Sequence, residues 1–360
     1  MLALGAVGAD AEHPWSGYGD PTGEEQQFLE LLNQVRANPL AYQTHLGTDL
    51  TAGNKFALVP RPPLVFNARL LEAARRHSQD MNDRGFFGHQ NPQGETAAQR
   101  LRAAGYAWLC YSENLAVAME TPAEALRELV VDDGIPDLGH RVSLLGLSEH
   151  STRLDEIGIG IHLGGGPHRK YYSLELAADA NPAPFVTGVA FRDSNRNGAY
   201  DPGEGLPGIQ VQIGNDAATV TSASGEYALP LPEPGSYVAT ASGPGLGAVR
   251  QAALTMGSVN TKLDFAVQPI LVAQVQVRTP ISGPAAATQS PVHPRPAAAP
   301  AKARPAASEI RNRTAVAGKP GKTRVAQARP AARPVTLSRK AARPAVAPRR
   351  PARVALRRKA

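Results

Sequence analysis

Apolar side chains recur at helical intervals through the first half of the chain. Within residues 24–38, Leu31 and Leu32 lie three and four positions after Phe28, and Val35 lies four and three positions after them. Pro39 follows this segment. This spacing places them on one face of an amphipathic helix that ends or kinks at the proline. The same reasoning predicts three more helices, at residues 67–85, 95–104 and 121–131.

Short β-prone runs lie between and after these helices. They are SENLAVA, EIGIGIHL and KYYSLELA, at residues 112–118, 156–163 and 170–177. Because these runs are few and do not alternate regularly with the helices, the pattern favours an α+β domain over repeated βαβ units.

The period changes after residue 181. Strand-length runs separated by Gly, Pro, Asp and Asn turns follow one another, and they are FVTGVAFR, GIQVQIG, ATVTSAS, GEYALPLP, GSYVATAS and KLDFAVQ. This pattern is typical of a small all-β sandwich. The expected organisation is a lead-in over residues 1–23, an α+β domain over 24–180 and a β-sandwich over 185–268.

The turn after the first of these runs has the pattern of a calcium loop, DSNRNGAYDPGE, at residues 193–204. Its oxygen-bearing positions one, three, five, nine and twelve are occupied by Asp193, Asn195, Asn197, Asp201 and Glu204. Such spacing lets oxygen atoms converge on a hard cation, and Gly198 at position six permits the sharp turn. We therefore predict that these five residues bind calcium. Strands rather than helices flank the loop, and the alternative is an ordinary Asp/Asn-Gly turn without an ion.

Residues 185–267 resemble the B-repeat modules of bacterial serine-aspartate-repeat and collagen-adhesin surface proteins. The shared pattern is GVAFRDSNRNGAYDPGEGLPGIQVQI with the later SASGEYALPLPEPGSYVAT. The resemblance implies an immunoglobulin-like, calcium-stabilised spacer that performs no chemistry.

Charge is distributed unevenly along the chain. Residues 271–360 hold 20 Lys or Arg and one acid, a net of +19, whereas residues 1–270 hold 18 basic and 30 acidic side chains, a net of −12. From about residue 279 onward Ala, Pro, Arg and Lys dominate, so we predict a disordered basic tail over 279–360. Its charge suits an anionic envelope polymer or surface. Nucleic acid is disfavoured because no aromatic residues interleave the charges, and a solvated tail without a specific partner is the alternative.

The N-terminus and the single cysteine indicate the setting. Val7-Gly8-Ala9 follows an apolar run and has the form of a signal-peptidase site, so we expect the remnant of a secretion signal rather than an ordinary unstructured end. Cys110 has no partner for an intramolecular disulfide and is expected to pack as a small side chain. No run of about 18 apolar residues occurs, which predicts no membrane span.

Three segments of the α+β domain carry side chains suited to chemistry. They are GFFGHQNP with His89, YSENLA with Glu113, and VVDDGIPDLGHR with Asp132, Asp133 and His140. Two histidines and two or three carboxylates can form a general acid–base site, or a zinc site with an open position. Sequence spacing alone does not place them together.

Residues 24–180 look like a bacterial member of the CAP superfamily, named for cysteine-rich secretory proteins, antigen 5 and pathogenesis-related 1 proteins. The landmarks, in order, are a first helix ending in RANP, then LLEAARRHSQDMNDRGFFGHQNP, GYAWLCYSENLA, GHR, and EIGIGIHL with KYYSLEL. The resemblance implies an α-β-α sandwich, secretion, and a cleft whose two histidines and two acids can hold a divalent metal such as zinc. Relatives are also associated with lipid or sterol binding.

Carried over residue by residue, His89 and His140 match the cleft histidines, and Glu113 matches the first acid. The second acid has to come from Asp132 or Asp133, and we prefer Asp133. The chain departs from the family in having VVDDGIPDLGHR where many relatives place a tryptophan-bearing helix, so the floor of the cleft is expected to differ. It also lacks the cysteines of animal and plant relatives.

Three functions remain open on the sequence. The first is a secreted protein that binds a lipid or a metal in the CAP-like domain, which a calcium-stabilised spacer and the tail connect to a surface. The second is a metal-dependent hydrolase centred on His89, Glu113 and His140, and the third is an adhesion protein in which the domain is only a rigid head. For the two histidines, a hydrogen-bonded structural network is the alternative to metal binding and catalysis. His77 is interpreted as part of a solvated helix face or of helix packing.

Overall fold

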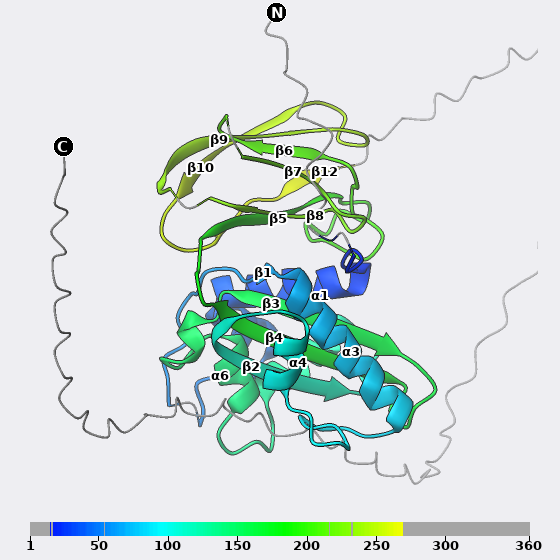
Figure 1. Ribbon diagram of the computed structural model, residues 1–360. Helices are drawn as coiled ribbons and strands as arrows, with labels where there is room; N and C mark the ends of the chain where they lie inside the picture. The colour runs from blue at the N-terminus through cyan, green and yellow to red at the C-terminus, as the bar shows by residue number, and fades with distance from the viewer. Residues whose placement is uncertain (1–14, 16, 54, 216, 232, 269–360) are drawn as a thin grey trace, which may run out of the picture.

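The computed structural model describes residues 15, 17–53, 55–215, 217–231 and 233–268. Most of the predicted signal remnant and the whole predicted tail over 279–360 lie outside the described residues. The described chain forms an α/β part, residues 15–180, with a β part, residues 185–268, stacked on it (Figure 1).

One sheet with helices on both faces forms the α/β part. Its strands are β1 (Val65–Phe66), β2 (Trp108–Val117), β3 (Glu156–Leu163) and β4 (Lys170–Asp179), in the spatial order β1-β3-β4-β2. β1 is parallel to β3, and β4 is antiparallel to both β3 and β2. The helices are α1 (Gly23–Ala37), α2 (Pro39–Leu46), α3 (Ala68–Arg84), α4 (Ala97–Ala103), α5 (Pro122–Val131), α6 (Gly139–Leu144) and the 3-10 helix η1 (Ser151–Arg153). Within the described residues, no helix is long and apolar enough to cross a membrane.

Local capping explains where the first two helices begin. The Thr22 hydroxyl accepts a hydrogen bond from the Glu25 backbone N–H, and the Glu25 carboxylate accepts one from the Thr22 N–H. This capping box satisfies two N–H groups that the helix itself leaves unpaired. Asn38 ends α1 and caps α2, so Pro39 stands at the first position of a new helix, where its missing N–H costs nothing.

Alternating residues of β3 determine how the helices pack on the sheet. Ile157 and Ile159 are fully buried in the main core with residues of α1 and α5. Gly158 and Gly160 face α3, and a Cβ added to Gly158 would lie only 2.0 Å from the carbonyl carbon of Leu70. Because only glycine lets the helix backbone come so near, α3 lies directly on the sheet. The result is the helix–sheet–helix layering that the CAP resemblance implies.

Two sheets facing each other form the β part. Its strands are β5 (Phe185–Arg192), β6 (Gln210–Ile213), β7 (Ala217–Val220), β8 (Glu226–Pro230), β9 (Gly235–Ser242), β10 (Arg250–Met256), β11 (Thr261–Lys262) and β12 (Phe265–Val267). One sheet has the order β10-β9-β6-β7, and in the other β5 pairs with β8, β11 and β12. Val211 and Ile213 from the first sheet share one core with Tyr227 and Phe265 from the second. The immunoglobulin-like topology stays a prediction.

Buried polar contacts join the two parts. Trp15 Nε1 donates a hydrogen bond of 2.9 Å to Glu226 Oε2, and the Trp15 ring meets Phe66 edge-on. Lys262 Nζ lies 2.8 Å from Glu30 Oε2 of α1. Burial raises the pKa of Glu226 to about 8, so this carboxyl group is mostly neutral at pH 7 and its contact with Trp15 buries little charge.

The close approach of α3 to β3 makes a direct prediction. Gly158→Ala forces a Cβ against the α3 backbone, and we expect the free energy of unfolding to fall by about 3 kcal/mol. Gly165→Ala is the matched control, because an added Cβ there meets nothing within 4 Å. Equilibrium urea unfolding measures both, and equal stability of the two variants would contradict the direct packing of α3 on the sheet.

Candidate functional site

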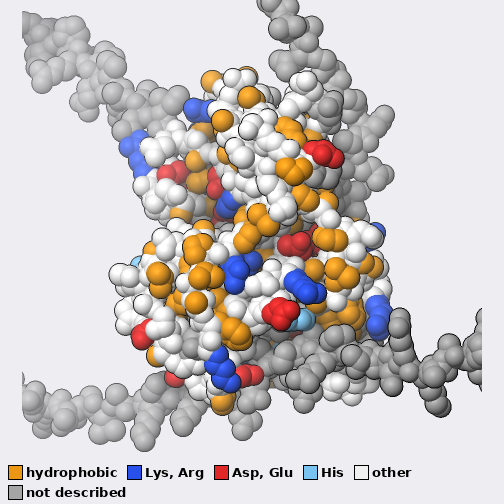
Figure 2. Space-filling model, turned by 90° about the vertical axis from the view of Figure 1, so that its left-hand side faces the viewer, with side chains coloured by type: hydrophobic (Ala, Val, Ile, Leu, Met, Phe, Trp, Pro, Cys, Tyr) orange, Lys and Arg blue, Asp and Glu red, His pale blue; other side chains and the backbone are white. Residues whose placement is uncertain are grey.

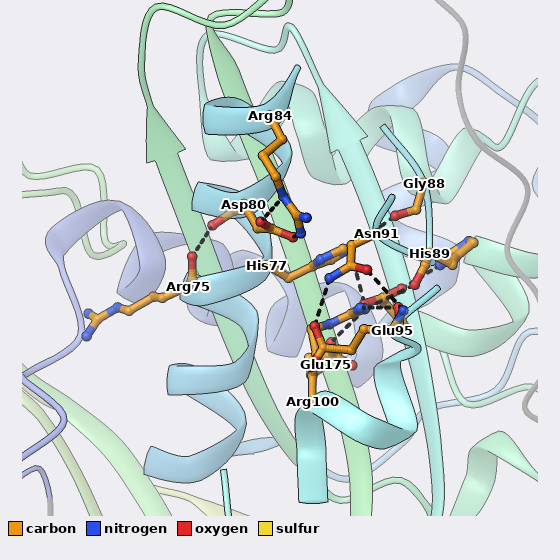
Figure 3. A network of polar contacts seen from close by, with 12 residues as sticks. Arg75, His77, Asp80, Arg84, Gly88, His89, Asn91, Glu95, Arg100 and Glu175 are labelled. Atoms are coloured by element: carbon orange, nitrogen blue, oxygen red, sulfur yellow. Dashed lines mark hydrogen bonds and ion pairs between the residues drawn. The ribbon is translucent and has the colours of Figure 1, made fainter. Parts of the chain in front are cut away.

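A buried polar cluster lies between the sheet and helices α3 and α4. Glu113 of β2 is its centre, with His89 Nδ1 at 2.6 Å from Oε1 and the Arg100 guanidinium paired with Oε2. His77 of α3 places Nε2 3.7 Å from Glu113 Oε2 and 3.1 Å from the carbonyl oxygen of Gly88. Figure 3 shows His77 of α3, His89 of the loop that follows and Arg100 of α4 pointing toward one another.

Glu175 completes this cluster from the neighbouring strand. It stands opposite Glu113 in the β2–β4 register, is fully buried, and lies 3.9 Å from Arg100 Nη2. Burial, and then the charge of Glu113, raise the pKa of Glu175 well above its ordinary value. Glu175 therefore keeps its proton, so a single carboxylate charge faces the Arg100 guanidinium.

The charge states of Glu113 and His77 also follow from the balance between burial and neighbouring charges. Burial acting alone would raise the pKa of Glu113, but the hydrogen bond with His89 and the positive charge of Arg100 bring it down to about 2. Burial lowers the pKa of His77 to about 4, so its imidazole is neutral near pH 7. Both oxygens of Glu113 are engaged, which suits a structural network better than a catalytic base or a metal ligand.

His140 belongs to a second network. The Asp132 carboxylate lies 2.6 Å from His140 Nδ1 and accepts the backbone N–H groups of His140 and Arg141, at 2.9 and 3.1 Å. Asp133, the acid preferred from the sequence, is exposed. The reason is local: α5 ends at Val131, and the left-handed conformation of Asp132 (φ 54°) returns its side chain to the start of α6. The acid beside His140 is thus Asp132.

The sheet separates the two networks. Glu113 faces α3 and α4, whereas its neighbours Ser112 and Asn114 face α6, where both hydrogen-bond to Ser143. Successive residues of a strand point to opposite faces, so the two predicted histidines belong to networks on different faces of β2. In the described part of the chain, no three His, Cys, Asp or Glu side chains are gathered as a metal site. Zinc binding stays a prediction that this arrangement does not favour.

Three members of the first cluster were not predicted as site residues. His77 was interpreted as helix packing or a solvated face, yet it is fully buried beside Glu113. Arg100 and Glu175 were not considered at all. A signal was present in KYYSLELA, because a glutamate amid buried strand residues requires a polar partner, but the sequence does not say which one.

An apolar groove lies apart from both networks, between α1, α2 and α5. Its volume is about 640 Å³. The apolar part of its lining is formed by Leu31, Val35, Ala41, Tyr42, Leu46, Ala123 and Leu126. The polar part of its lining is formed by Gln34, Asn38, His45, Glu124 and Arg127, all of which are exposed. The groove was not predicted, because it depends on how far α2 stands from α5.

The predicted calcium loop is folded around its first and last residues. Asp193 is 2% exposed, and its Oδ2 accepts the Gly198 N–H at 3.1 Å. Asp193 Oδ1 is buried and has no hydrogen-bond partner among the described residues. Glu204 is buried as well, with Oε1 accepting the Ser194 N–H at 2.7 Å. A buried carboxylate oxygen without a donor, in a loop of oxygen-bearing side chains, fits a hard cation.

The other predicted ligands face one another. The side-chain amides of Asn195 and Asn197 both donate to Asp201 Oδ2, each over 2.7 Å. These bonds hold Asp201 within the loop. Among the described residues, the carboxylates of Asp193, Asp201 and Glu204 are not gathered closely enough to form a metal site. Calcium binding stays a prediction that requires these side chains to turn inward.

The buried acid pair predicts opposite pH effects for two variants. Glu113→Gln removes the carboxylate that pairs directly with the buried Arg100 cation and should lower the free energy of unfolding by about 3 kcal/mol at neutral pH. The native Glu113 contribution is present above its ordinary pKa of 4.5 and disappears as pH falls toward 2.

The Glu175 carboxyl group has the opposite effect on how stability depends on pH. Its raised pKa means that unfolding releases a proton above pH 4.5, so native stability falls as pH rises. Glu175→Gln removes this dependence. The free energy of unfolding of the variant, minus that of wild type, should therefore increase as the pH rises from about 5 to about 8. Urea unfolding at both pH values tests it, and a constant difference between Glu175→Gln and wild type would show that Glu175 is ionised in the folded protein.

Comparison with known proteins identifies the α/β part. Residues 29–170 match the sequence model of the CAP family, the cysteine-rich secretory protein family. The uncharacterized protein YkwD of Bacillus subtilis is 29% identical over 98 residues, which are 27% of this chain and 34% of that protein. The chain therefore spans about a third of that relative.

Two of the solved structures with some likeness come from an extracellular protein and an outer surface protein. An extracellular protein with an SCP domain from Bacillus anthracis is 21% identical, with 43% of this chain and 40% of that chain covered and a TM-score of 0.30. An outer surface protein of Borrelia burgdorferi is 14% identical, with 43% and 94% covered and a TM-score of 0.30. The family model, rather than these weak structural likenesses, identifies residues 29–170 of this chain as a CAP domain.

Proposed function

We propose that the CAP domain binds an amphipathic lipid with an anionic head group, such as a fatty acid, outside the cell. The observation that carries this proposal is the groove of about 640 Å³ between α1, α2 and α5. Ligand pockets are typically about 300–1,000 Å³, with apolar walls and a small number of polar groups. The groove has this size and this kind of lining.

The two ends of such a ligand have different partners in the groove. Leu31, Val35 and Leu126 offer an apolar wall for an acyl chain. His45 and Arg127 are exposed and basic, and they suit a carboxylate or phosphate head group. Glu124, the acid in the same lining, accepts the Thr121 N–H in the capping box of α5. The lipid association of relatives, taken from the family resemblance, agrees with this assignment.

The arrangement favours this binding function over hydrolysis. A hydrolase built on His89, Glu113 and His140 requires these groups to face one substrate. Glu113 is instead held by Arg100 on one side of β2, and His140 belongs to α6 on the other side. His140 is also fully buried.

The remaining segments extend the proposal to attachment. We infer a calcium-stabilised, immunoglobulin-like spacer in residues 185–268, and secretion, which the CAP resemblance and the apolar residues before Ala9 support. Figure 2 shows one face of the described molecule, where side chains of both charge signs lie together. The strongly basic character belongs instead to residues 271–360, with +19, which suit an anionic polymer of a cell envelope.

A variant that fills the groove tests lipid binding. Ala41→Trp places a large side chain in the groove from α2, so we expect the affinity for a fluorescent fatty acid to fall about tenfold or more. Ala103→Trp is the matched control, because Ala103 is an exposed helical alanine that does not line this groove. Equal binding by wild type and Ala41→Trp, or no binding by wild type, would contradict the proposal.

Calcium binding by the loop has its own test. A calcium concentration of about 100 times Kd should stabilise the folded protein by about 2.7 kcal/mol relative to chelator. Asp193→Asn removes the buried carboxylate and should abolish most of this gain, whereas Asp137→Asn, an exposed acid outside the loop, should retain it. Thermal unfolding with calcium and with chelator measures the difference, and a chelator-insensitive wild type would refute a calcium-stabilised spacer.

A further inference from the structure

The predicted calcium loop packs against the CAP domain instead of standing free. Gln27 of α1 donates a hydrogen bond of 2.9 Å from Nε2 to Asp201 Oδ1. At the start of the same helix, a Cβ added to Gly23 would lie 3.1 Å from Cα of Pro202. The ninth position of the loop is therefore held directly by the other part of the protein.

Asp201 is held from two sides. Its Oδ1 accepts from Gln27 of the CAP domain, while its Oδ2 accepts from Asn195 and Asn197 within the loop. A carboxylate that has to turn toward an ion loses less freedom when a neighbour already fixes part of its position. Gln27 is placed to do this.

Other contacts hold α1 and the β part in the same arrangement. Lys262 lies 2.8 Å from Glu30, three residues along α1 from Gln27, and 2.5 Å from Asp264 in the β part. Asn260 Nδ2 donates to the carbonyl oxygens of Pro63 and Asp155, at 3.2 and 2.9 Å. The position of Gln27 relative to the loop is thus determined by the whole junction.

We propose that calcium binding in the loop is coupled to docking of the β part on α1, with Gln27 as the positioning residue that presents Asp201 to the ion. This inference rests on the calcium binding proposed above. Coupling of two equilibria is reciprocal, so calcium strengthens the docking and a weakened contact at Gln27 lowers the calcium affinity. The ion then controls the orientation of the CAP domain on its spacer.

The affinity arm of the test uses the full chain and calcium alone. Isothermal titration calorimetry of Gln27→Ala should give a calcium Kd about tenfold higher than wild type, since a hydrogen bond to a charged group is lost. Gln79→Ala is the control, because Gln79 is an exposed glutamine on α3 whose side-chain amide donates to Asp83 of the same helix. A merely structural role for Gln27 would lower thermal stability without calcium and leave the calcium Kd unchanged.

The docking arm uses Trp15, which is 4% exposed and bonded to Glu226 across the junction. In a Trp108→Phe background, Trp15 is the remaining tryptophan of the chain. Calcium should lower acrylamide quenching of its fluorescence, and Gln27→Ala should reduce this calcium effect.

The outcomes separate the two proposals. If wild type binds calcium but Gln27→Ala has the same Kd, or if calcium leaves Trp15 quenching unchanged, the coupling is wrong while calcium binding stands. If wild type binds no calcium, both the calcium-stabilised spacer and the coupling are wrong.

Discussion

The depth at which α3 lies on the sheet is the constraint on which the rest of the CAP domain depends. Gly158 and Gly160 leave no side chain between β3 and the helix, so the α3 backbone packs against the strand itself. At this depth His77 reaches Glu113 inside the polar cluster. On the other side of α3, Arg75 reaches the carbonyl oxygens of Tyr18, Gly19 and Asp20 in the N-terminal segment. One close contact thus positions both a buried network and the segment that leads to Trp15.

The pKa values of Glu113, Glu175 and Glu226 follow from the groups that surround each buried acid. An acid that meets a cation or several donors stays ionised, and an acid without them keeps its proton. Glu113 beside Arg100 is the first case and Glu226 is the second, whereas Glu175 keeps its proton because burial and the charge of Glu113 outweigh the Arg100 cation 3.9 Å away. The arrangement avoids an unpaired buried charge, whose desolvation costs several kcal/mol. It also means that the Glu113 and Arg100 charges balance each other before any ligand arrives, which agrees with a stabilising role.

The sequence predicted the elements and the family better than it predicted the site. Helical spacing around Phe28 and the strand runs were sufficient because burial of one face determines local periodicity. The sequence did not decide between Asp132 and Asp133, because that choice depends on one left-handed residue at the end of α5. Similarly, SENLA was recognised as carrying Glu113, but its alternation in β2 separates that residue from the His140 network. Shared membership in a motif says little about which face of a strand a side chain occupies.

Helix α1 connects the proposals for this protein. Its buried face, with Phe28 and Leu32, belongs to the core, and its C-terminal half lines the groove at Leu31 and Val35. Its first turns contact the β part through Gln27 and Glu30. The loop contact and the groove wall therefore both depend on how the core holds this one helix.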